Sequence, residues 1–496
     1  MRLIRPVWKW LDERLQVGAT IHEAATHPVP SRTASWWYVF GSASMVLFAL
    51  QVVTGICLAL VYVPSADQAF QSLEALNYEQ PLGWYLRAMH GWGSNFMVAV
   101  VLLHMVQVVL FGAYKFPREL TWIVGVFLLL CTLGMAFTGQ ILRFDQDAYW
   151  GLGIGASIAG RTPVLGPQIV QVMLGGPIIA GATLTRFFAL HVFVIPGTLI
   201  GLLCVHLLMV VKLGINEWPM PGRLVRRKTY VKEYDALVHK DGVPFVPVAF
   251  TRDLVFGGAI ILAVMACAAY FGPFGPKGFP DPTIVDTLPR PDYFFLWLFA
   301  VASLLPPHLE TPALLVGPVI GIGLLLALPF IAGEGEKSWR RRPMAVLTIV
   351  LVAVSLGTLT RLGTTAPWSP VMNAWSAAPV PAAHLQGRTA LERQGALVLQ
   401  AKQCRNCHEL GDEGGRRGPA LDDVAVRLTR DQLIRQVLQG GGNMPAYGNS
   451  LSPAETTALV AFLESCAPKG QRPARDSAEP AGPAAPAASP VTLSSR

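Results

Sequence analysis

Two long apolar segments of the chain each carry a pair of histidines at nearly the same spacing. His90 and His104 are fourteen residues apart, and His191 and His206 are fifteen apart. On a helix these intervals rise about 21–23 Å and return the two imidazoles of a segment to within roughly 60° of one face. Each segment thus places one imidazole near each surface of a membrane. Imidazoles that face each other across a helix bundle suit a six-coordinate haem, and a proton path, a metal centre or core packing are the alternatives.

Glycines repeat the same interval in two other apolar segments. Gly41 and Gly55 are fourteen residues apart, as are Gly125 and Gly139. Glycine lets a helix backbone approach a flat object closely. Two histidine helices and two glycine helices would therefore clasp two stacked macrocycles, although small residues also serve ordinary helix packing.

The elements that must position these residues are transmembrane helices. Of the 496 residues, 52% are hydrophobic and 14% are charged, whereas about a quarter of the residues of a soluble domain are charged. A membrane-spanning helix needs about 20 apolar residues. Seven segments meet this length: 36–62, 88–111, 121–141, 186–212, 253–272, 312–332 and 344–362.

The charges of the connections predict how the spans are oriented. The net charge is +8, and the basic residues cluster in the N-terminal arm and in the links KFPREL, RLVRRKTYVKEY and EKSWRRRP. Because these runs adjoin apolar segments, they indicate orientation in a bilayer rather than a nucleic-acid partner. The positive-inside rule places the N-terminus in the cytoplasm, and seven spans place the C-terminus on the opposite side.

A second chemical motif follows the last span. Cys404, Cys407 and His408 form C-x-x-C-H, the pattern in which two thiols bind haem c covalently and the histidine ligates the iron. A zinc site would need two further ligands, and no second pair lies nearby. Downstream, Met444 in NMPAYG is the predicted sixth ligand, and Ser452 begins a helix with a glutamate three residues later.

Taken together, these stretches make the segment from about 33 to 362 resemble cytochrome b of the cytochrome bc complexes. The supporting motifs are QVVTG, RAMHGW, PRELTW, TLTRFFALH and GPFGPKGFPDPTIVDTLPRPDYF. The histidine spacing resembles the split, photosynthetic type, here fused to its second polypeptide, and NMPAYG after C-x-x-C-H resembles class I cytochrome c. The resemblance implies that His90 and His191 ligate a low-potential haem near the outer face, and that His104 and His206 ligate a high-potential haem near the cytoplasm.

The resemblance also implies roles for three arginines and one valine. Arg87, Arg118 and Arg186 are candidate partners of the haem propionates, and interfacial snorkelling is the alternative. In the photosynthetic type, a cysteine on the first span holds an additional haem, but Val39 stands at that position. We therefore expect two noncovalent haem b groups and one covalent haem c.

The stretch PRPDYF resembles the quinol-oxidation motif usually written PEWY. Pro291, Asp292 and Tyr293 are its candidate catalytic residues. A partly buried carboxylate at the membrane edge can take a proton from a hydroquinone as it is oxidised. Phe294 replaces the tyrosine of the motif, so the hydroxyl at Tyr293 is displaced by one position. Taken alone, the same residues would also suit a proline-rich helix start.

The expected fold class is all-α: a seven-span transmembrane bundle that binds two haems, followed by a small all-α cytochrome c domain. The expected parts are a cytoplasmic arm (1–35), a four-helix di-haem core (36–215), a three-helix quinol-site region (216–362), a linker (363–387), the cytochrome c domain (388–467) and a disordered Ala/Pro-rich tail (468–496).

The function that the resemblance implies is that of the cytochrome b subunit of a quinol:cytochrome c oxidoreductase in a bacterial inner membrane. Its expected partners are quinol and quinone, a Rieske iron–sulfur protein, a downstream cytochrome c or terminal oxidase, the lipid membrane and a second copy of the chain. A di-haem membrane anchor of a quinone-linked dehydrogenase or hydrogenase, and a haem-bearing sensor or structural subunit, are the alternatives.

Overall fold

The computed structural model describes residues 9–10, 12–14, 16–66, 68–175, 179, 181–280, 290–305, 307–365, 379–406, 408–414, 418–440, 444, 447–448, 450–468 and 471. Cys407 lies outside these residues, as do most of the predicted linker and most of the predicted tail. The described residues form two compact units, one containing those up to Thr365 and the other those from Pro379 onward.

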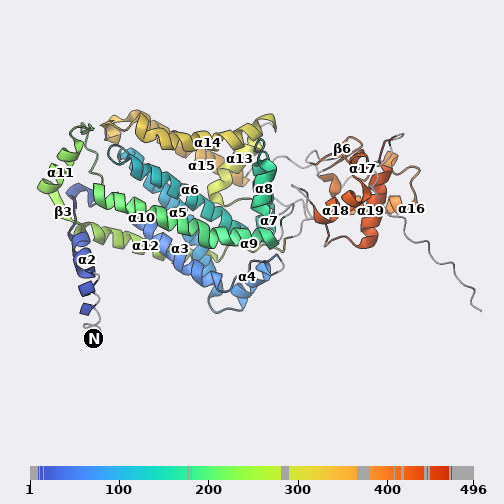
Figure 1. Cartoon of the computed structure of the whole chain (residues 1–496), viewed down its shortest axis with the longest axis horizontal. Helices are drawn as coiled ribbons and strands as arrows, with labels where there is room; N and C mark the ends of the chain where they lie inside the picture. The colour runs from blue at the N-terminus through green and yellow to red at the C-terminus, as the bar shows by residue number, and fades with distance from the viewer. Residues whose placement is uncertain are drawn as a thin grey trace, which may run out of the picture. The chain divides into compact units, whose positions relative to one another are not determined.

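The first unit contains the seven predicted membrane spans, and the expectation of an all-α bundle is confirmed. Within the described residues, seven helices are long and apolar enough to cross a membrane. Helices α3, α5, α6, α10 and α12 run side by side (Figure 1). The seven spans are α3 (Phe40–Ala59), α5 (Gly83–Leu110), α6 (Glu119–Ile141), α9 with η2 and α10 (Gly181–Leu213), the segment Phe245–Phe271 with α12 (Phe250–Phe271), α14 (Pro307–Ile331) and α15 (Pro343–Thr365).

Side-chain contacts show which connections share a face of the bundle. The links 111–118, 214–249 and 332–342 meet at one end, which we call the basic face. They contain α11 (Tyr230–Asp241), β2 (Leu224–Val225), β3 (Gly242–Pro244) and β4 (Gly335–Glu336). Strand β2 pairs with β4, and β3 pairs with β1 (Pro28–Pro30) of the N-terminal arm. The opposite face carries α4 (Ala69–Tyr78), α7 (Gln146–Gly160), α8 (Gly166–Leu174) and α13 (Leu296–Leu304).

Buried or half-buried cations cap the ends of three spans at the basic face. The last carbonyls of a helix have no partner within the helix and carry partial negative charge, so a cation stabilises them. Two of these contacts join the first four spans to the last three. In one the cation follows α5 and the carbonyl follows α14, and in the other the cation precedes α15 and the carbonyl belongs to α5. The pairs are Lys115 with the Glu334 carbonyl after α14 (2.7 Å), Arg342 with the Leu110 carbonyl of α5 (2.6 Å) and Arg118 with the Leu213 carbonyl of α10 (2.9 Å).

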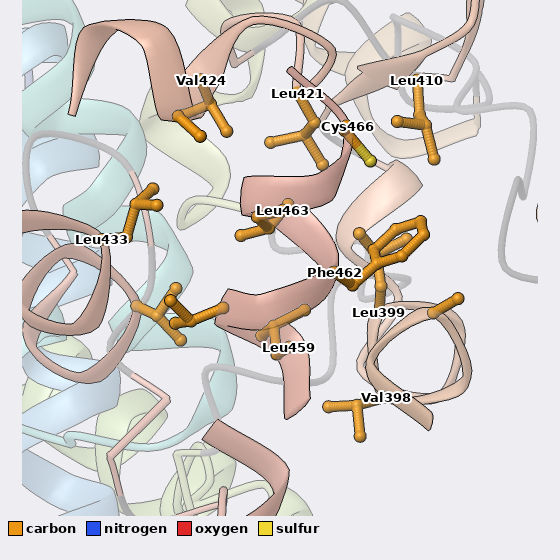
Figure 2. Packing of buried hydrophobic residues seen from close by; sticks show 14 of the residues in the cluster. Val398, Leu399, Leu410, Leu421, Val424, Leu433, Leu459, Phe462, Leu463 and Cys466 are labelled. Carbon is orange, nitrogen blue, oxygen red and sulfur yellow. The ribbon is translucent and has the colours of Figure 1, made fainter. Parts of the chain in front are cut away.

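The second unit is a small helical domain with its own apolar core. Side chains from its helices point towards one another, among them Leu399, Leu433 and Phe462 (Figure 2). A Cβ at Gly395 would lie 1.9 Å from the Ala458 carbonyl oxygen, so two helices cross in contact there. The elements are α16 (Ala390–Ala401), η8 (Cys404–Asn406), β5 (Glu409–Leu410), β6 (Glu413–Gly414), α17 (Val424–Arg427), α18 (Arg430–Gln439) and α19 (Pro453–Ser465).

Local sequence sets the helix starts of this domain. Ser452 and Glu455 form a capping box at the start of α19, which confirms the predicted start of this helix. The same reciprocal arrangement begins α16 and α18. Val380 and Leu385, which precede α16, pack against the core. The packed part of this unit therefore begins before the predicted boundary at residue 388.

Candidate functional site: two histidine pairs and a C-x-x-C-H loop

The first histidine pair has the spacing of two ligands on one metal ion. The ring centres of His90 on α5 and His191 in η2 are 6.3 Å apart, and the ring planes differ by 76°. A metal–imidazole bond is about 2.0–2.1 Å long and the bonding nitrogen lies about 1.1 Å from the ring centre, so two imidazoles on one ion have centres about 6.3 Å apart. The pair therefore fits a haem iron without movement of either helix.

Each of the four predicted glycines faces one of the four histidines. If a Cβ were added to each glycine, its distances to the nearest imidazole Cε1 would be 2.8 Å for Gly139 and His191, 3.2 Å for Gly55 and His90, 3.4 Å for Gly41 and His104, and 3.6 Å for Gly125 and His206. The two glycines of α3 thus face the two histidines of α5, and the two glycines of α6 face the two histidines of the fourth span, His191 and His206. Their common interval makes room for the imidazoles themselves, in addition to the close backbone approach that the sequence suggests.

Two threonines fix the imidazoles of the first pair. Thr54 Oγ1 lies 2.9 Å from His90 Nδ1, and Thr138 Oγ1 lies 2.9 Å from His191 Nδ1. Each hydroxyl donates to the carbonyl four residues earlier in its own helix. Its oxygen is therefore left to accept the Nδ1–H, and Nε2 is free to bind a metal.

The second pair lies at the other end of the bundle and lacks this arrangement. The buried Nδ1 of His104 has no hydrogen-bond partner within the described residues. A buried polar atom without a partner is uncommon in a folded protein. The two pairs thus share the facing glycines and differ in how the imidazoles are held.

A π-helical turn explains the unequal histidine spacings. Residues Leu190–Val194, which include His191, form η2 between α9 (Gly181–Ala189) and α10 (Ile195–Leu213). A π turn adds one residue to a helix. The fifteen-residue step from His191 to His206 therefore advances about as far as the fourteen-residue step on α5, and both pairs come into register. Pro196, which lacks an N–H, lies just after the turn.

The candidate quinol motif packs against α5 and α6. Phe294 is buried between Val98 of α5 and Ala136 of α6. The Asp292 amide donates to Gln140 Oε1 at 3.5 Å, and Gln140 is the neighbour of Gly139, which faces His191. The short helix η4 (Tyr293–Phe295) continues from this point into α13. The structure thus places Asp292 beside α6, one residue along that helix from the glycine that faces His191.

The two polar side chains of this motif differ in acidity. Burial raises the pKa of the Asp292 carboxyl, Arg143 and Lys277 lower it, and Asp145 raises it. The Tyr293 hydroxyl donates to the Asn95 carbonyl at 2.8 Å, and burial raises its pKa to about 12. The phenol therefore stays protonated at neutral pH, which leaves the carboxylate as the group of this motif that can accept a proton.

The histidine of the C-x-x-C-H motif has a fixed tautomer. His408 Nδ1 lies 2.7 Å from the Pro419 carbonyl oxygen, so the ring donates through Nδ1 and presents Nε2. A Cβ at Gly418 would lie 2.3 Å from His408 Cε1. Only glycine at 418 leaves room for this ring, and the arrangement fits an axial haem ligand.

Two further predicted haem c residues, Cys404 and Met444, lie at the domain core. Cys404 in η8 and Met444 are partly buried and pack against it. Gln436 Nε2 lies 3.5 Å from the Met444 sulfur. The buried Arg405, between the two cysteines, donates to the Pro379 carbonyl at 2.7 Å and pairs with Glu413 at 3.1 Å. These contacts hold the motif to the start of the domain.

Comparison with known proteins identifies both units. Residues 25–214 match the family described as "Cytochrome b/b6/petB", and residues 390–463 match "Cytochrome C oxidase, cbb3-type, subunit III". Cytochrome b6 of Heliobacterium mobile is 41% identical over 209 residues, which are 42% of this chain and 98% of that protein. The chain belongs to the cytochrome b family. It carries a c-type cytochrome domain at its C-terminal end, and the two domains imply haem b and haem c.

Further relatives extend the similarity beyond the first four spans. The menaquinol:cytochrome c reductase cytochrome b subunit of Bacillus subtilis (strain 168) is 38% identical over 43% of this chain and 99% of that protein. Cytochrome b of Rhodobacter capsulatus is 32% identical over 63% of this chain and 71% of that protein. A solved structure, "Hyperthermophilic respiratory Complex III", superposes with a TM-score of 0.62 at 30% identity over 72% of this chain and 91% of that chain. This cytochrome b is therefore an integral membrane protein.

The three predicted arginines of cytochrome b each bind backbone carbonyls. Arg87 is buried and donates to the Phe274 carbonyl at 3.0 Å, and Arg118 is buried at the end of α10. Arg186 is exposed and donates to the Gln171 carbonyl of α8 at 3.3 Å. All three thus link segments near the ends of the spans, and their role toward propionates stays a prediction.

A pocket at the basic face escaped the sequence analysis. Its lining includes Ser35, Tyr38, Ile215 and Asp253. The hydroxyl oxygens of Ser35 and Tyr38 are buried there without a hydrogen-bond partner in the described part of the chain. Asp253 accepts a hydrogen bond from Ser42 at 2.8 Å, next to Gly41, which faces His104. Unpaired polar groups beside a carboxylate are suited to a polar ligand headgroup.

One sequence signal could have found the two threonines. Thr54–Gly55 and Thr138–Gly139 are the same dipeptide, placed at the second glycine of each glycine helix. By contrast, the pocket at the basic face joins residues from Thr33 to Asp253. No local pattern predicts a contact over that separation.

Proposed function

We propose that this chain is the cytochrome b subunit of a quinol:cytochrome c oxidoreductase with a fused haem c. The observation that carries the proposal is the packing of the Asp292 segment on α5 and α6, the helix that carries His90 and the helix whose glycine faces His191. The similarity to a menaquinol:cytochrome c reductase cytochrome b subunit and to a respiratory complex III supports it.

The residues that hold the cofactors follow from the two units. His90 with His191, and His104 with His206, would each hold one noncovalent haem b, with the four glycines beside them. Cys404 and Cys407 would bind haem c covalently, with His408 and Met444 as its axial ligands. When bound, these haems carry single electrons between the quinone sites and the external acceptor.

Asp292 is the proposed proton acceptor during quinol oxidation. Its raised pKa places its protonation nearer the working pH than that of an exposed aspartate, which favours general base catalysis. Pro291 sets the extended backbone before η4, and Tyr293 anchors the segment to α5 through the Asn95 carbonyl. These residues hold the carboxylate at the membrane edge.

The pocket at the basic face is the proposed site of quinone reduction. Ser35 and Tyr38 offer unpaired hydroxyls to quinone carbonyls, and Asp253 offers a carboxyl group. The pocket lies beside Gly41 and hence beside the second histidine pair. Quinol oxidation at one face and quinone reduction at the other would release and take up protons on opposite sides of the membrane.

The proposed orientation puts the basic face in the cytoplasm of a bacterium, following the positive-inside rule. The c-type domain, which we place from about Pro379, then lies on the outer side. A Rieske protein would accept one electron of each quinol and reduce haem c. A downstream cytochrome c or terminal oxidase would be the next acceptor, and two copies of the chain would form the complex.

The test is quinol-dependent cytochrome c reduction by the purified complex, with Asp292→Asn compared with Asp147→Asn. Asp147 pairs with Lys277 on the same face and serves as the matched control. We expect Asp292→Asn to slow turnover about 10²-fold or more with full haem content. Wild-type turnover should fall as the pH drops through the raised pKa, because the carboxylate is lost, and this acid limb should be absent in the variant. Unchanged turnover in Asp292→Asn contradicts the proposed role.

A further inference from the structure

A buried lysine–glutamate pair lies on the basic face, outside the sites described above. Lys337, in the link between α14 and α15, is 1% exposed, and Glu217, just after α10, is 3% exposed. Lys337 Nζ lies 3.4 Å from Glu217 Oε1, 2.6 Å from Asn216 Oδ1 and 2.9 Å from the Tyr230 hydroxyl. A buried charge is costly, and a lysine in this position readily changes its protonation state.

The pair is connected to the surface on one side. Glu217 Oε1 accepts from Arg223 Nε at 3.1 Å, and Arg223 also pairs with Glu233 of α11. The side chains of Arg223 and Glu233 are 25% and 41% exposed. The buried Glu217 carboxylate is therefore paired directly with Arg223, whose side chain reaches the solvent.

On the other side the pair approaches the quinone pocket. Asn216 binds Lys337, and its neighbour Ile215 lines the pocket together with Tyr38. Burial raises the pKa of Tyr38, while the Asn216 amide and Arg118 lower it in smaller measure, so these groups lie near its hydroxyl. From the solvent side to the pocket, the groups lie in the order Glu217, Lys337, Asn216 and Tyr38, and the partly exposed Arg223 binds Glu217 at the solvent end.

We propose that Lys337 and Glu217 form a proton relay that supplies the quinone pocket on the basic face. Reduction of one quinone to quinol takes two electrons and two protons. In the relay, the Lys337 ammonium releases a proton towards the pocket and regains one from water through Glu217, so the lysine is unchanged after each transfer. This inference rests on the proposed function, since it deepens the quinone-reduction site.

The electrostatics around Lys337 agree with a group that exchanges protons. Burial lowers its pKa to about 7, Glu217 raises it, and Arg118 and Arg223 lower it. The other groups at Nζ are the neutral Tyr230 hydroxyl and the Asn216 amide. The lowered pKa brings loss of the ammonium proton closer to neutral pH than in an exposed lysine, which is almost fully protonated there.

The chain offers a matched control in Lys115. This lysine is 3% exposed on the same face and donates to the backbone carbonyls of Ala332 and Glu334. Its contacts cap a helix and do not lead to the pocket. Lys115→Met therefore removes a buried lysine from the same region without touching the relay.

The experiment follows the oxidation of haem b by a short-chain quinone in the purified complex. The complex is reduced with limiting dithionite in the Asp292→Asn background and mixed with the quinone in H₂O and D₂O between pH 6 and 9. The variants are Lys337→Met, Lys337→Arg and the control Lys115→Met. Arginine keeps the charge but does not release its proton, so the relay predicts that it fails as methionine does.

We expect both Lys337 variants to slow haem b oxidation at least about tenfold at pH 7 and to lose the decline of the wild-type rate above pH 7. Lys115→Met should keep the wild-type pH profile and solvent isotope effect. If Lys337→Met fails to assemble, the double variant Glu217→Gln with Lys337→Met, which leaves no unpaired charge, gives the same test.

Two outcomes overturn the relay. One is a wild-type rate and pH profile in Lys337→Met, and the other is rescue of both by Lys337→Arg, which would show a structural ion pair. The absence of haem b oxidation by quinone in the reference complex contradicts the quinone-reduction site itself and hence the proposed function. The two failures are thus distinguishable.

Discussion

The bundle and the c-type domain orient their histidines by the same kinds of contact. The residues that make these contacts are close in sequence in the domain and distant in sequence in the bundle. In both, an oxygen accepts the Nδ1–H and a glycine faces the ring: Thr138 and Gly139 for His191, Pro419 and Gly418 for His408. In the domain, the three residues lie within a dozen positions. In the bundle, the partner helix lies some fifty residues away along the chain.

The difference shows what each site depends on. A local loop can be ordered by its own hydrogen bonds and turns, whereas the bundle needs four helices at one depth and rotation. The π-helical turn at His191 is part of that register, because it absorbs one extra residue. Changes at the bundle should therefore act through helix register, and changes at the loop should act locally.

The largest expected effect follows from substituting one histidine in each site, because each substitution should affect only the haem that its own site holds. His191→Leu should remove the haem b of the first pair and abolish quinol turnover, while haem c stays bound. His408→Leu should leave the haem b spectrum unchanged and remove the axial ligand of haem c. Optical spectra of the two purified variants measure this. Simultaneous loss of both haem types in either variant would contradict the independence of the two sites.

A smaller effect is expected when a methyl group is added to the facing glycines. Gly418→Ala places Cβ 2.3 Å from His408 Cε1, and Gly139→Ala places it 2.8 Å from His191 Cε1, whereas Gly125→Ala meets His206 at 3.6 Å, an ordinary contact. We expect the first two to cost about 1–3 kcal/mol each. Thermal release of haem, followed by absorbance, should rank Gly418→Ala above Gly139→Ala and leave Gly125→Ala near wild type. A reversed ranking would show that the facing glycines do not set the fit.

The smallest effect concerns the hydroxyl acceptor in the bundle. Thr138→Val leaves the His191 Nδ1–H buried and unpaired, which costs about 1 kcal/mol, at the low end for a buried donor without a partner. The less electron-rich imidazole should also raise the midpoint potential of this haem b. Thr132→Val on the same helix is the control, because Thr132 is buried and bonds to the Leu128 carbonyl. Equal midpoint potentials in the two variants, measured by redox titration, would contradict a role of the Thr138 hydroxyl in holding the His191 imidazole.

Much of the fold could be predicted because its signals are local. The seven spans follow from length and hydropathy, and the capping box at Ser452 follows from three residues. The shared glycine interval marked these four positions, but the sequence related them to the macrocycles and not to the imidazoles that they face. These features repeat along one helix, so periodicity reveals them.

The unpredicted features all depend on contacts distant in sequence. The pocket joins Tyr38 to Asp253, and the buried pair joins Glu217 to Lys337 across about 120 residues. The basic residues counted for orientation proved to cap helix ends, as Lys115, Arg118 and Arg342 do. The basic residues in the links predicted which segments lie at one face of the bundle. The individual contacts between those segments follow only from the three-dimensional structure.

The most direct test is a pyridine haemochrome spectrum of the purified chain. The account predicts two noncovalent haem b groups for each covalent haem c, with no further covalent haem, since Val39 offers no thiol. Absence of haem b would contradict the assignment of the four histidines. An additional covalently bound haem would contradict the alignment of the first span.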